Sequence, residues 1–465
     1  MKTLGILVFT ALVLFVLLQA VRPGIPAGPA TAEFQAPPAV KQVFEKNCYS
    51  CHSNERRLSW FDQIVPGYWL VRHDILTARR HLNFSTLGAK PAAQQKATLY
   101  EAVNMIQLGA MPLPAFVKLH PEARVTAEEL ATVKAYLAPW GPAPNPPLAG
   151  PAAGNAAAAQ APMGAAAPAA PPVSLAAVAP EWNGLAFDPS FESWKPISTT
   201  ERGDNDSFRF ILGNDVAVRA AQSGAISPWP DGARFAKIAW QRERGADGLL
   251  HPGKFIQVEL MVKDASAYKR NEGWGWGRWR GMNLKPYGAS AGFVVECTSC
   301  HLPLRGDDYV YTLPMTRATA NRDEVVNTTA SALPATLPYQ PLGWNAITLY
   351  VDPRTQTTAV LYGNDVAMRA AQARGDVPPG GSAAPVYPAG SVLALVTWTQ
   401  RDDPHWFGAR IPSVPQSVEF VEIAAGSVNQ YRRFGGSGFE EQHLAGDAAA
   451  QRANFVLGLA PVRLP

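Results

Sequence analysis

The sequence predicts an α+β multidomain protein, in which a mainly helical N-terminal domain precedes two β-rich lobes. Apolar residues recur at helical spacing in the N-terminal part, short strand-like runs dominate the remainder, and an Ala/Pro-rich stretch separates the two. The chain has 465 residues, too many for one ordinary domain and enough for roughly three.

Residues 1–24 combine one lysine, Lys2, with a long uncharged apolar run that ends before Arg22. Such a run can span a bilayer, and a cytoplasmic Lys2 with the remainder outside follows the positive-inside rule. A cleaved signal peptide is the alternative, for which "LLQAVRPG" is a poor cleavage site. Both readings place the protein on the periplasmic side of the bacterial inner membrane, and we favour an N-terminal membrane anchor.

Residues 33–142 are expected to form the helical domain. "PAVKQVFEKNCYSCH" and "AAQQKATLYEAVNMIQLG" carry apolar residues at helical spacing, and "TAEELATVKAYLAPW" opens with a Thr-x-x-Glu capping signal. Residues 143–180 are nearly pure Ala, Pro and Gly, which predicts a linker stiffened by proline.

The part after the linker repeats itself. "ILGNDVAVRAAQSG" at 211–224 returns as "LYGNDVAMRAAQAR" at 361–374, and "WPDGARFAKIAWQR" at 229–242 returns as "YPAGSVLALVTWTQR" at 387–401. "GNDVAxRAAQ" reads as a short helix, whereas "ARFAKIAW", "KFIQVELMV" and "ITLYVD" read as strands. The repeat predicts two homologous lobes, at 181–325 and 336–465.

Charge and cysteine usage narrow the function. The net charge is +4, and no Lys/Arg-rich run is present, so we expect no nucleic-acid partner. All four cysteines lie in two Cys-x-x-Cys-His motifs, which leaves none for a structural disulfide; they are Cys48, Cys51, Cys297 and Cys300.

A Cys-x-x-Cys-His motif supplies two thiols for thioether bonds to haem and a histidine for the iron. We therefore predict two covalently bound c-type haems, with His52 and His301 as iron ligands. A zinc site would need four ligands, and no second cysteine pair lies near either motif.

The sixth ligand distinguishes the two sites. Met111 stands in the Pro-rich "MPLPAFVKLHPEAR" after the first motif, and Met/His ligation raises the potential, as electron transfer requires. Four rival ligands remain open; they are His73, His81, Met105 and His120. After the second motif only Met315 is near, and its close spacing makes it a poor candidate.

The N-terminal segments "CYSCHSNERRLSWFDQIVPGYWLVRHDILTARRHLNFS" and "MPLPAFVKLHPEAR" resemble the haem-binding domain family of small membrane-anchored bacterial cytochromes c. The resemblance covers nearly all of residues 33–142. Where that family usually has Pro-Trp after the motif, this chain reads Ser59-Trp60.

Three later segments resemble cytochrome P460, in that family's order. They are "FILGNDVAVRAAQSGAISPWPDGARFAKIAW", "GKFIQVELMVKDASAYKRNEGWGWGRW" and "GFVVECTSCHLPLRGDDYVYT". The resemblance implies a largely antiparallel sheet, one c-type haem with five-coordinate iron, and oxidation of hydroxylamine. It also implies a lysine cross-linked to the porphyrin, six residues after the Asp of an Asp-Gly turn; here Asp231-Gly232 leads to Lys237.

Strand alternation puts Lys237 on one face with Phe235 and Ala239. A lysine on an inward face is costly unless it is used. In the second lobe, which lacks a Cys-x-x-Cys-His motif, Leu395 stands at the equivalent position. This substitution favours inward placement of Lys237 beside the haem, although an outward, solvated lysine is the usual case.

Three further features bear on the second haem. In "NEGWGWGRW", alternation leaves a bare glycine face that would let a flat ring approach, unless the aromatic residues simply pack in the core. Glu259 and Arg209 are candidates for proton transfer or, alternatively, partners in a structural ion pair. The haemless lobe could pair with the first one, giving an intrachain pseudo-dimer.

These features predict a dihaem oxidoreductase in which Lys237 and His301 form the reacting centre. The substrate would be hydroxylamine or a related small nitrogen compound, and electrons would pass to the first haem and then to a redox partner cytochrome or a quinol-linked complex. Two alternatives remain: a nitric oxide-binding or sensing cytochrome without turnover, similar to the cytochromes c′-β, and a pure dihaem electron carrier.

Overall fold

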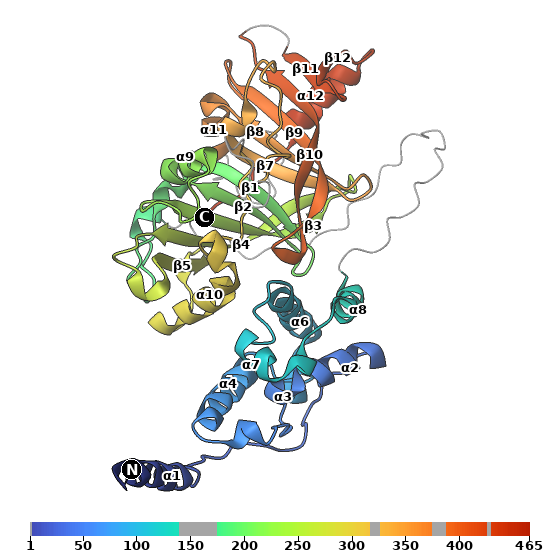
Figure 1. Cartoon of the computed structure of the whole chain (residues 1–465). Helices are drawn as coiled ribbons and strands as arrows, with labels where there is room; N and C mark the ends of the chain where they lie inside the picture. Colours follow the sequence, from blue (N-terminus) through green and yellow to red (C-terminus); the bar gives the residue numbers. More distant parts are fainter. Residues whose placement is uncertain (1, 139–173, 317–325, 374–386, 426–428) are drawn as a thin grey trace. The chain divides into compact units, whose positions relative to one another are not determined.

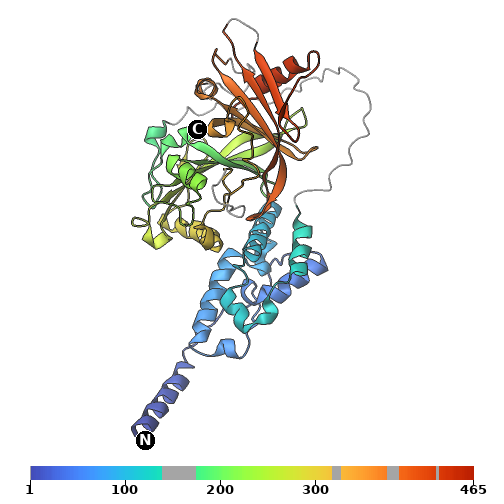
Figure 2. The same ribbon diagram turned by 45° about the horizontal axis from the view of Figure 1, so that its top comes forward.

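The computed structural model describes residues 2–138, 174–316, 326–373, 387–425 and 429–465. The chain divides into two compact units, Met1–Pro139 and Trp140–Pro465, each of which is described by itself (Figures 1 and 2). Most of the predicted linker, residues 143–173, lies outside the described residues.

The first unit is helical, as predicted. Its α-helices are α1 (Lys2–Leu18), α2 (Pro38–Asn47), α3 (Tyr49–His52), α4 (Gly67–His81), α5 (Phe84–Leu87), α6 (Ala92–Gln107), α7 (Pro114–Leu119) and α8 (Ala127–Leu137). The capping box is confirmed, because the Thr126 side chain accepts from Glu129 N and the Glu129 carboxylate accepts from Thr126 N. Across the described residues, none of the helices has both the length and the apolar character needed to cross a membrane.

An aromatic cluster forms the centre of this unit beneath the first motif. Phe34, Phe44 and Tyr49 surround Phe84, with ring centroids 4.8–6.1 Å from that of Phe84. Phe44 and Phe84 are almost fully buried. Buried aromatic pairs of this kind hold α2, α3 and α5 together, so the motif helix α3 rests on a rigid base.

The second unit carries the strands and the remaining α-helices. The strands are β1 (Lys195–Arg202), β2 (Ser207–Gly213), β3 (Arg234–Arg244), β4 (Leu250–Lys263), β5 (Trp274–Arg280), β6 (Lys285–Pro286), β7 (Asn345–Asp352), β8 (Thr357–Gly363), β9 (Val392–Asp403), β10 (Trp406–Glu422), β11 (Gln430–Gly435) and β12 (Glu440–Gln442). The helices are α9 (Asp215–Ser223), α10 (Val294–His301), α11 (Asp365–Gln372) and α12 (Ala448–Gly458). The predicted strands and the two "GNDVA" helices are confirmed.

Element order repeats between the two halves of this unit. Strands β1 to β5 with α9 correspond to β7 to β11 with α11, and each "GNDVA" helix is capped by its asparagine, Asn214 or Asn364. All pairings are antiparallel, in the order β1-β2-β3-β4-β7-β8-β9-β10, and β10 also pairs with β1. The eight strands therefore form a closed ring to which both lobes contribute.

The main core lies inside this ring and belongs to both lobes. Alternate residues of β3, Ala236, Ile238 and Trp240, point into it together with Trp398 and Phe420 of the second lobe. The opposite faces carry separate clusters, one covered by α9 and α10 in the first lobe and one covered by α11 and α12 in the second (Figure 1). Phe235 lies in the first of these clusters, so the predicted alternation of β3 is confirmed.

Candidate functional site

The first motif sits at the junction of α2 and α3. The Nδ1 atom of His52 lies 3.0 Å from the carbonyl oxygen of Leu82. Because a carbonyl oxygen can only accept, Nδ1 carries the proton, and the lone pair of the neutral ring is on Nε2. His52 is thereby prepared to bind a metal through Nε2, with its ring orientation fixed by the backbone.

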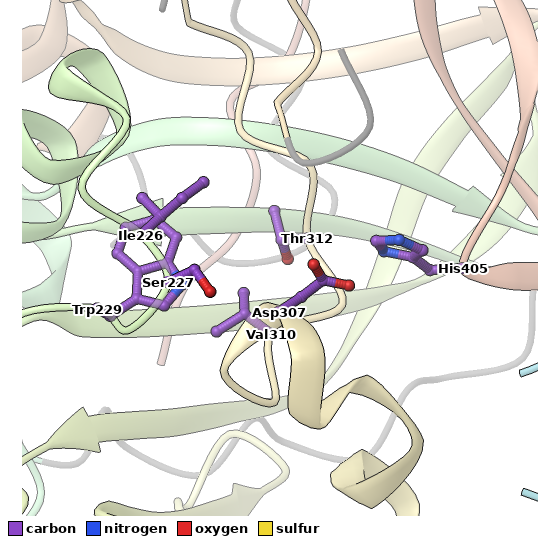
Figure 3. A pocket seen from close by; sticks show the side chains of 7 residues that line it. All are labelled: Ile226, Ser227, Trp229, Asp307, Val310, Thr312 and His405. Carbon is purple, nitrogen blue, oxygen red and sulfur yellow. The ribbon is translucent and has the colours of Figure 1, made fainter. Parts of the chain in front are cut away.

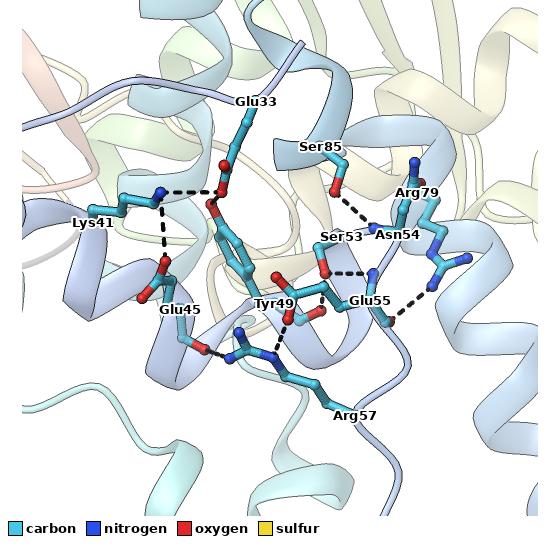
Figure 4. A network of polar contacts seen from close by, with 10 residues as sticks. All are labelled: Glu33, Lys41, Glu45, Tyr49, Ser53, Asn54, Glu55, Arg57, Arg79 and Ser85. Carbon is cyan, nitrogen blue, oxygen red and sulfur yellow. Dashed lines mark hydrogen bonds and ion pairs between the residues drawn. The ribbon is translucent and has the colours of Figure 1, made fainter. Parts of the chain in front are cut away.

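Hydrogen bonds hold the residues that flank this motif (Figure 4). The Tyr49 hydroxyl donates to Glu33 over 3.1 Å, and the Ser53 hydroxyl donates to the Tyr49 carbonyl over 2.8 Å. The backbone N–H of Asn54 donates to the Ser85 hydroxyl over 2.9 Å. Both ends of α3 are thus tied to neighbouring segments, which fixes the direction of the two thiols and of His52.

A cavity of about 330 Å³ lies beside the motif. Its lining combines apolar and cationic side chains: Lys46, Ser50, Arg56, Arg57, Leu58, Ser59, Phe116, His120, Glu122 and Ala123. The lining is mostly polar: its cations, Lys46, Arg56 and Arg57, could pair with the carboxylates of a haem, and only Leu58, Phe116 and Ala123 are apolar.

The structure separates the candidates for the sixth ligand. Both ring nitrogens of buried His120 face carboxylates, Nε2 at 3.0 Å from Asp62 and Nδ1 at 3.3 Å from Glu122, so neither is available to iron. His73 and His81 are exposed on α4. Met111 is half-buried in the loop between α6 and α7, and its N–H donates to the Met105 carbonyl over 3.0 Å. Within the described residues neither a hydrogen bond nor a ring contact joins Met111 to His52, so their pairing stays a prediction.

The second motif forms the end of α10. His301 Nδ1 lies 2.6 Å from the Tyr309 carbonyl oxygen, which can only accept, so the lone pair of this neutral ring is also on Nε2. The rings of Trp276 and Tyr311 contact the imidazole, with centroid distances of 4.6 and 4.9 Å. Burial lowers the pKa of His301 to about 4, partly opposed by the hydrogen bond to Tyr309, and the ring is therefore neutral at pH 7.

The carbonyl that orients His301 belongs to an unusual turn. Asp308 and Tyr309 have φ values of 48° and 68°, a left-handed conformation that costs non-glycine residues ~1–3 kcal/mol each. A buried ion pair fixes this turn, since Lys263 Nζ lies 2.8 Å from Asp308 Oδ1 and the N–H of Trp229 donates to Oδ2. Asp308 thus holds this turn in place.

Lys237 belongs to a charged cluster on the face of the sheet that carries Phe235. Its Nζ lies 2.6 Å from Glu259 Oε2, and Arg278 Nε lies 3.3 Å from Glu259 Oε1. Gln257 donates its side-chain amide to the same carboxylate. The register explains the cluster, because Lys237 is opposite Glu259 on β4 and Glu259 is opposite Arg278 on β5.

The charges in this cluster shift one another's pKa values. Burial would raise the pKa of Glu259, but the charges of Lys237 and Arg278 outweigh it and lower the value to about 2. Burial lowers the pKa of Lys237 to about 8 against the opposing effect of Glu259, and burial lowers that of Arg209 to about 9. The charges of Lys237, Glu259 and Arg278 also act on His301 and Cys297, so the cluster adjoins the second motif.

The tryptophan face of β5, rather than its glycine face, borders the second motif. Trp276 contacts His301, whereas a Cβ at Gly275 would meet the Tyr268 ring at 2.5 Å and one at Gly277 would meet the Trp279 ring at 2.6 Å. The prediction of an open glycine face is therefore wrong, because side chains from neighbouring segments already fill that side. Met315 is also no ligand candidate, since it is buried in the shared core.

The second lobe preserves most of the register of this cluster but not the lysine. Leu395 is opposite Glu419, and Glu419 is opposite Arg433, in the positions of Lys237, Glu259 and Arg278. Glu419 is buried and pairs with Arg452 of α12 at 2.8 Å, and α12 packs on β10 and β11 (Figure 1). Helix α12, with Arg452 as the cation that pairs with Glu419, thus occupies this face of the second lobe.

Two features of the second motif suit a bound haem. Within the described residues Cys297 and Cys300 form no disulfide and are half-buried, and burial raises the pKa of Cys297 to about 11. Buried Arg209 Nε and Trp276 Nε1 find no hydrogen-bond partner within the described residues. Unpaired buried donors beside a histidine with a free Nε2 fit a cofactor that carries both iron and carboxylates.

The fold and the two motifs define a haem cytochrome. Residues 9–139 match the family described as haem-binding domain, and residues 189–312 match cytochrome P460. The chain therefore joins a haem-binding domain to a cytochrome P460 domain, and haem is its cofactor. No curated protein matches the sequence.

Sequence reasoning missed several residues of the second site. Gln257 and Arg278 complete the cluster around Glu259, and Lys263 fixes the turn at Asp308. The spacing of Gln257 and Lys263 from Glu259 was an available signal, because residues two or four positions apart on a strand lie on the same face. The residues that pair with them across strands could not be found from the sequence, since that pairing depends on the register between strands.

Proposed function

We propose that the protein is an exported dihaem c-type cytochrome whose second centre oxidises hydroxylamine or a related small nitrogen compound. The observation that carries this proposal is the position of Lys237 and Glu259 beside the second motif, in a domain that matches cytochrome P460. A lysine and a carboxylate at the edge of a haem site supply a group for cross-linking and a group for proton transfer.

Each haem, when bound, supplies an iron that accepts and passes on electrons. In this proposal His52 and His301 hold the irons through Nε2, Met111 completes the first centre, and the four thiols form the thioether links. The first centre would carry electrons away from the second, and a partner cytochrome or a quinol-linked complex would receive them.

Glu259 is the proton acceptor in this proposal. Oxidising hydroxylamine releases protons together with electrons, and an ionised carboxylate near the substrate can receive them. The positive charge of Lys237, together with that of Arg278, lowers the pKa of Glu259 to about 2. A covalent bond from the Lys237 nitrogen to an aromatic ring removes that charge, so cross-linking would raise the pKa of Glu259 and make it a better base.

Nitric oxide binding without turnover is the second candidate. The 2.6 Å contact with Glu259 favours it, because a lysine that donates to a carboxylate is protonated and a poor nucleophile. The pKa of about 8 favours the cross-link, since an appreciable neutral fraction is present near that pH.

One experiment separates the candidates. The full chain with Cys48→Ser and Cys51→Ser would retain only the second haem, so its reduced spectrum reports that centre alone. A red-shifted Soret band and consumption of hydroxylamine support the proposal. A normal five-coordinate spectrum with nitric oxide binding favours the second candidate, and a normal six-coordinate spectrum indicates a pure electron carrier.

Glu259→Gln should slow hydroxylamine oxidation by about 10²-fold, the scale of losing one proton-transfer group. The same change should lower the pKa of Lys237 below about 8, because the Glu259 charge raises it. Steady-state rates measure the first effect, and the pH dependence of cross-link formation, followed as the growth of the red-shifted band, measures the second. Glu272→Gln, which alters a half-exposed pair with Arg305 instead, is the matched control. Full activity in Glu259→Gln would exclude it as the proton acceptor.

Met111→Leu should remove the sulfur ligand of the first haem and lower its reduction potential. The iron–sulfur charge-transfer band of the oxidised protein should disappear, whereas haem content stays unchanged. Met105→Leu, six residues earlier and half-buried, is the control and should keep the band. Loss of the band in Met105→Leu alone would reassign the ligand.

The remaining parts of the chain extend the proposal. The apolar side chains of α1, such as Phe9 and Leu12, are exposed, which supports attachment of this segment to a periplasm-facing membrane surface.

The second lobe is a haemless copy that pairs with the first within one chain, and the shared strand ring supports such a pseudo-dimer.

A further inference from the structure

The second lobe contacts residues 308–311, the segment that orients His301. Tyr311 lies against the His301 ring, edge to face, at a centroid distance of 4.9 Å, and its hydroxyl donates to the Cys300 carbonyl over 2.7 Å. Tyr311 is two residues after Tyr309, whose carbonyl accepts from His301. Whatever holds Tyr311 therefore also sets the position of the histidine ring.

The turn between β9 and β10 holds Tyr311 from the side of the second lobe. His405 Nδ1 lies 2.8 Å from the Tyr311 carbonyl oxygen, and the Trp406 ring meets the Tyr311 ring at 5.4 Å. Since the carbonyl accepts, His405 Nδ1 is the donor. One turn thus contacts both the backbone and the ring of the residue that packs on His301.

The first lobe fixes this turn in return. Arg202 lies over the Trp406 ring at 4.1 Å, and Trp406 Nε1 donates to Asp204 Oδ2 over 3.3 Å. The pairing of β1 with β10 begins close by, at Arg202 opposite Ala409. The turn is therefore not a free loop but is locked at the closure of the strand ring.

Little space remains between the turn and the segment. The hollow bordered by His405, Asp307 and Thr312 measures about 10 Å³, room for about one water molecule. Figure 3 shows His405 at one end of this hollow, with Ile226 and Trp229 at the other end. Packing this close transmits a change in the turn to the segment rather than absorbing it.

We infer that His405 and Trp406 are positioning residues for His301, so that the haemless lobe sets the geometry of the haem ligand in the other lobe. The segment needs such support, because Asp308 and Tyr309 adopt left-handed backbone conformations that surrounding contacts must maintain. Lys263 supports its start from the first lobe and His405 supports its end from the second. This inference rests on the proposed role of His301 as the iron ligand.

The test is the iron–histidine stretching band of the reduced full-length protein, measured by resonance Raman spectroscopy. A six-coordinate first haem contributes no such band, so the signal reports the second centre. His405→Leu and Trp406→Leu should shift the band to lower frequency and broaden it at unchanged haem content, because a looser Tyr309 carbonyl makes the imidazole a weaker ligand.

Two comparisons separate positioning from general stability. His405→Asn offers an amide N–H in place of Nδ1–H and should restore the band. His251 lies next to the corresponding β3–β4 turn and pairs with Asp247 at 2.9 Å. His251→Leu should leave the band in place. If a leucine variant fails to fold, Trp406→Phe, which keeps an aromatic edge, should give a smaller shift in the same direction.

A band that is present and unmoved in the folded variants overturns this inference alone. A wild-type protein without the band overturns both the proposed function and the inference that rests on it.

Discussion

Lys237→Leu should abolish the red-shifted Soret band and slow hydroxylamine oxidation by about 10- to 100-fold, the usual effect of losing a group that tunes a metal centre. The change copies the second lobe, in which Leu395 occupies the equivalent register position opposite Glu419. Arg278 would still pair with Glu259, as Arg452 pairs with Glu419 in the second lobe, so the fold should be retained. Absorption spectra, haem content and steady-state rates measure the outcome.

The matched control is Lys254→Leu, an exposed lysine on the adjacent strand β4. It removes the same charge from the same lobe without touching the cluster, and it should leave spectrum and rate unchanged. A red shift that survives Lys237→Leu would show that this amine forms no cross-link. If the red shift is lost while nitric oxide still binds normally, the iron site itself is intact and only the cross-link has been removed.

Local elements could be predicted from the sequence because their causes are local. Thr126 and Glu129 begin α8 as a capping box, and Asn214 and Asn364 cap the two repeated helices. Alternation along β3 correctly separated Phe235 from Ala236. Each of these patterns spans only a few residues, so no tertiary information was needed.

The partners of the site residues could not be predicted in this way. The contacts of Lys237 with Glu259 and of Glu259 with Arg278 depend on which strands pair and in what register. The glycine face of β5 looked open because the sequence does not reveal that Tyr268 and Trp279 cover it. His405 is 104 positions from His301 in sequence, and only the closure of the strand ring brings its turn to Tyr311.

The two lobes should unfold as one body, because their main core is shared. Trp240 of the first lobe donates from Nε1 to the carbonyl of Arg463 near the C-terminus, over 2.8 Å. Trp398 of the second lobe donates to the carbonyl of Ala330, between the lobes, over 2.7 Å. Both rings are fully buried in the core inside the strand ring, so neither lobe can lose its side of the core without exposing that of the other.

Trp398→Ala should therefore lower the free energy of unfolding by about 3–5 kcal/mol, the cost of emptying a buried tryptophan site. The second haem would stay attached through its thioether bonds, but its Soret band, which reports ligation by His301 in the other lobe, should change in the same urea transition that tryptophan fluorescence reports. Trp182→Ala, which removes a ring that is 55% exposed, should shift the transition by less than about 0.5 kcal/mol. If Trp398→Ala instead splits the transition, with the haem signal unmoved, the lobes fold independently and the haemless lobe cannot be required for the structure of its neighbour.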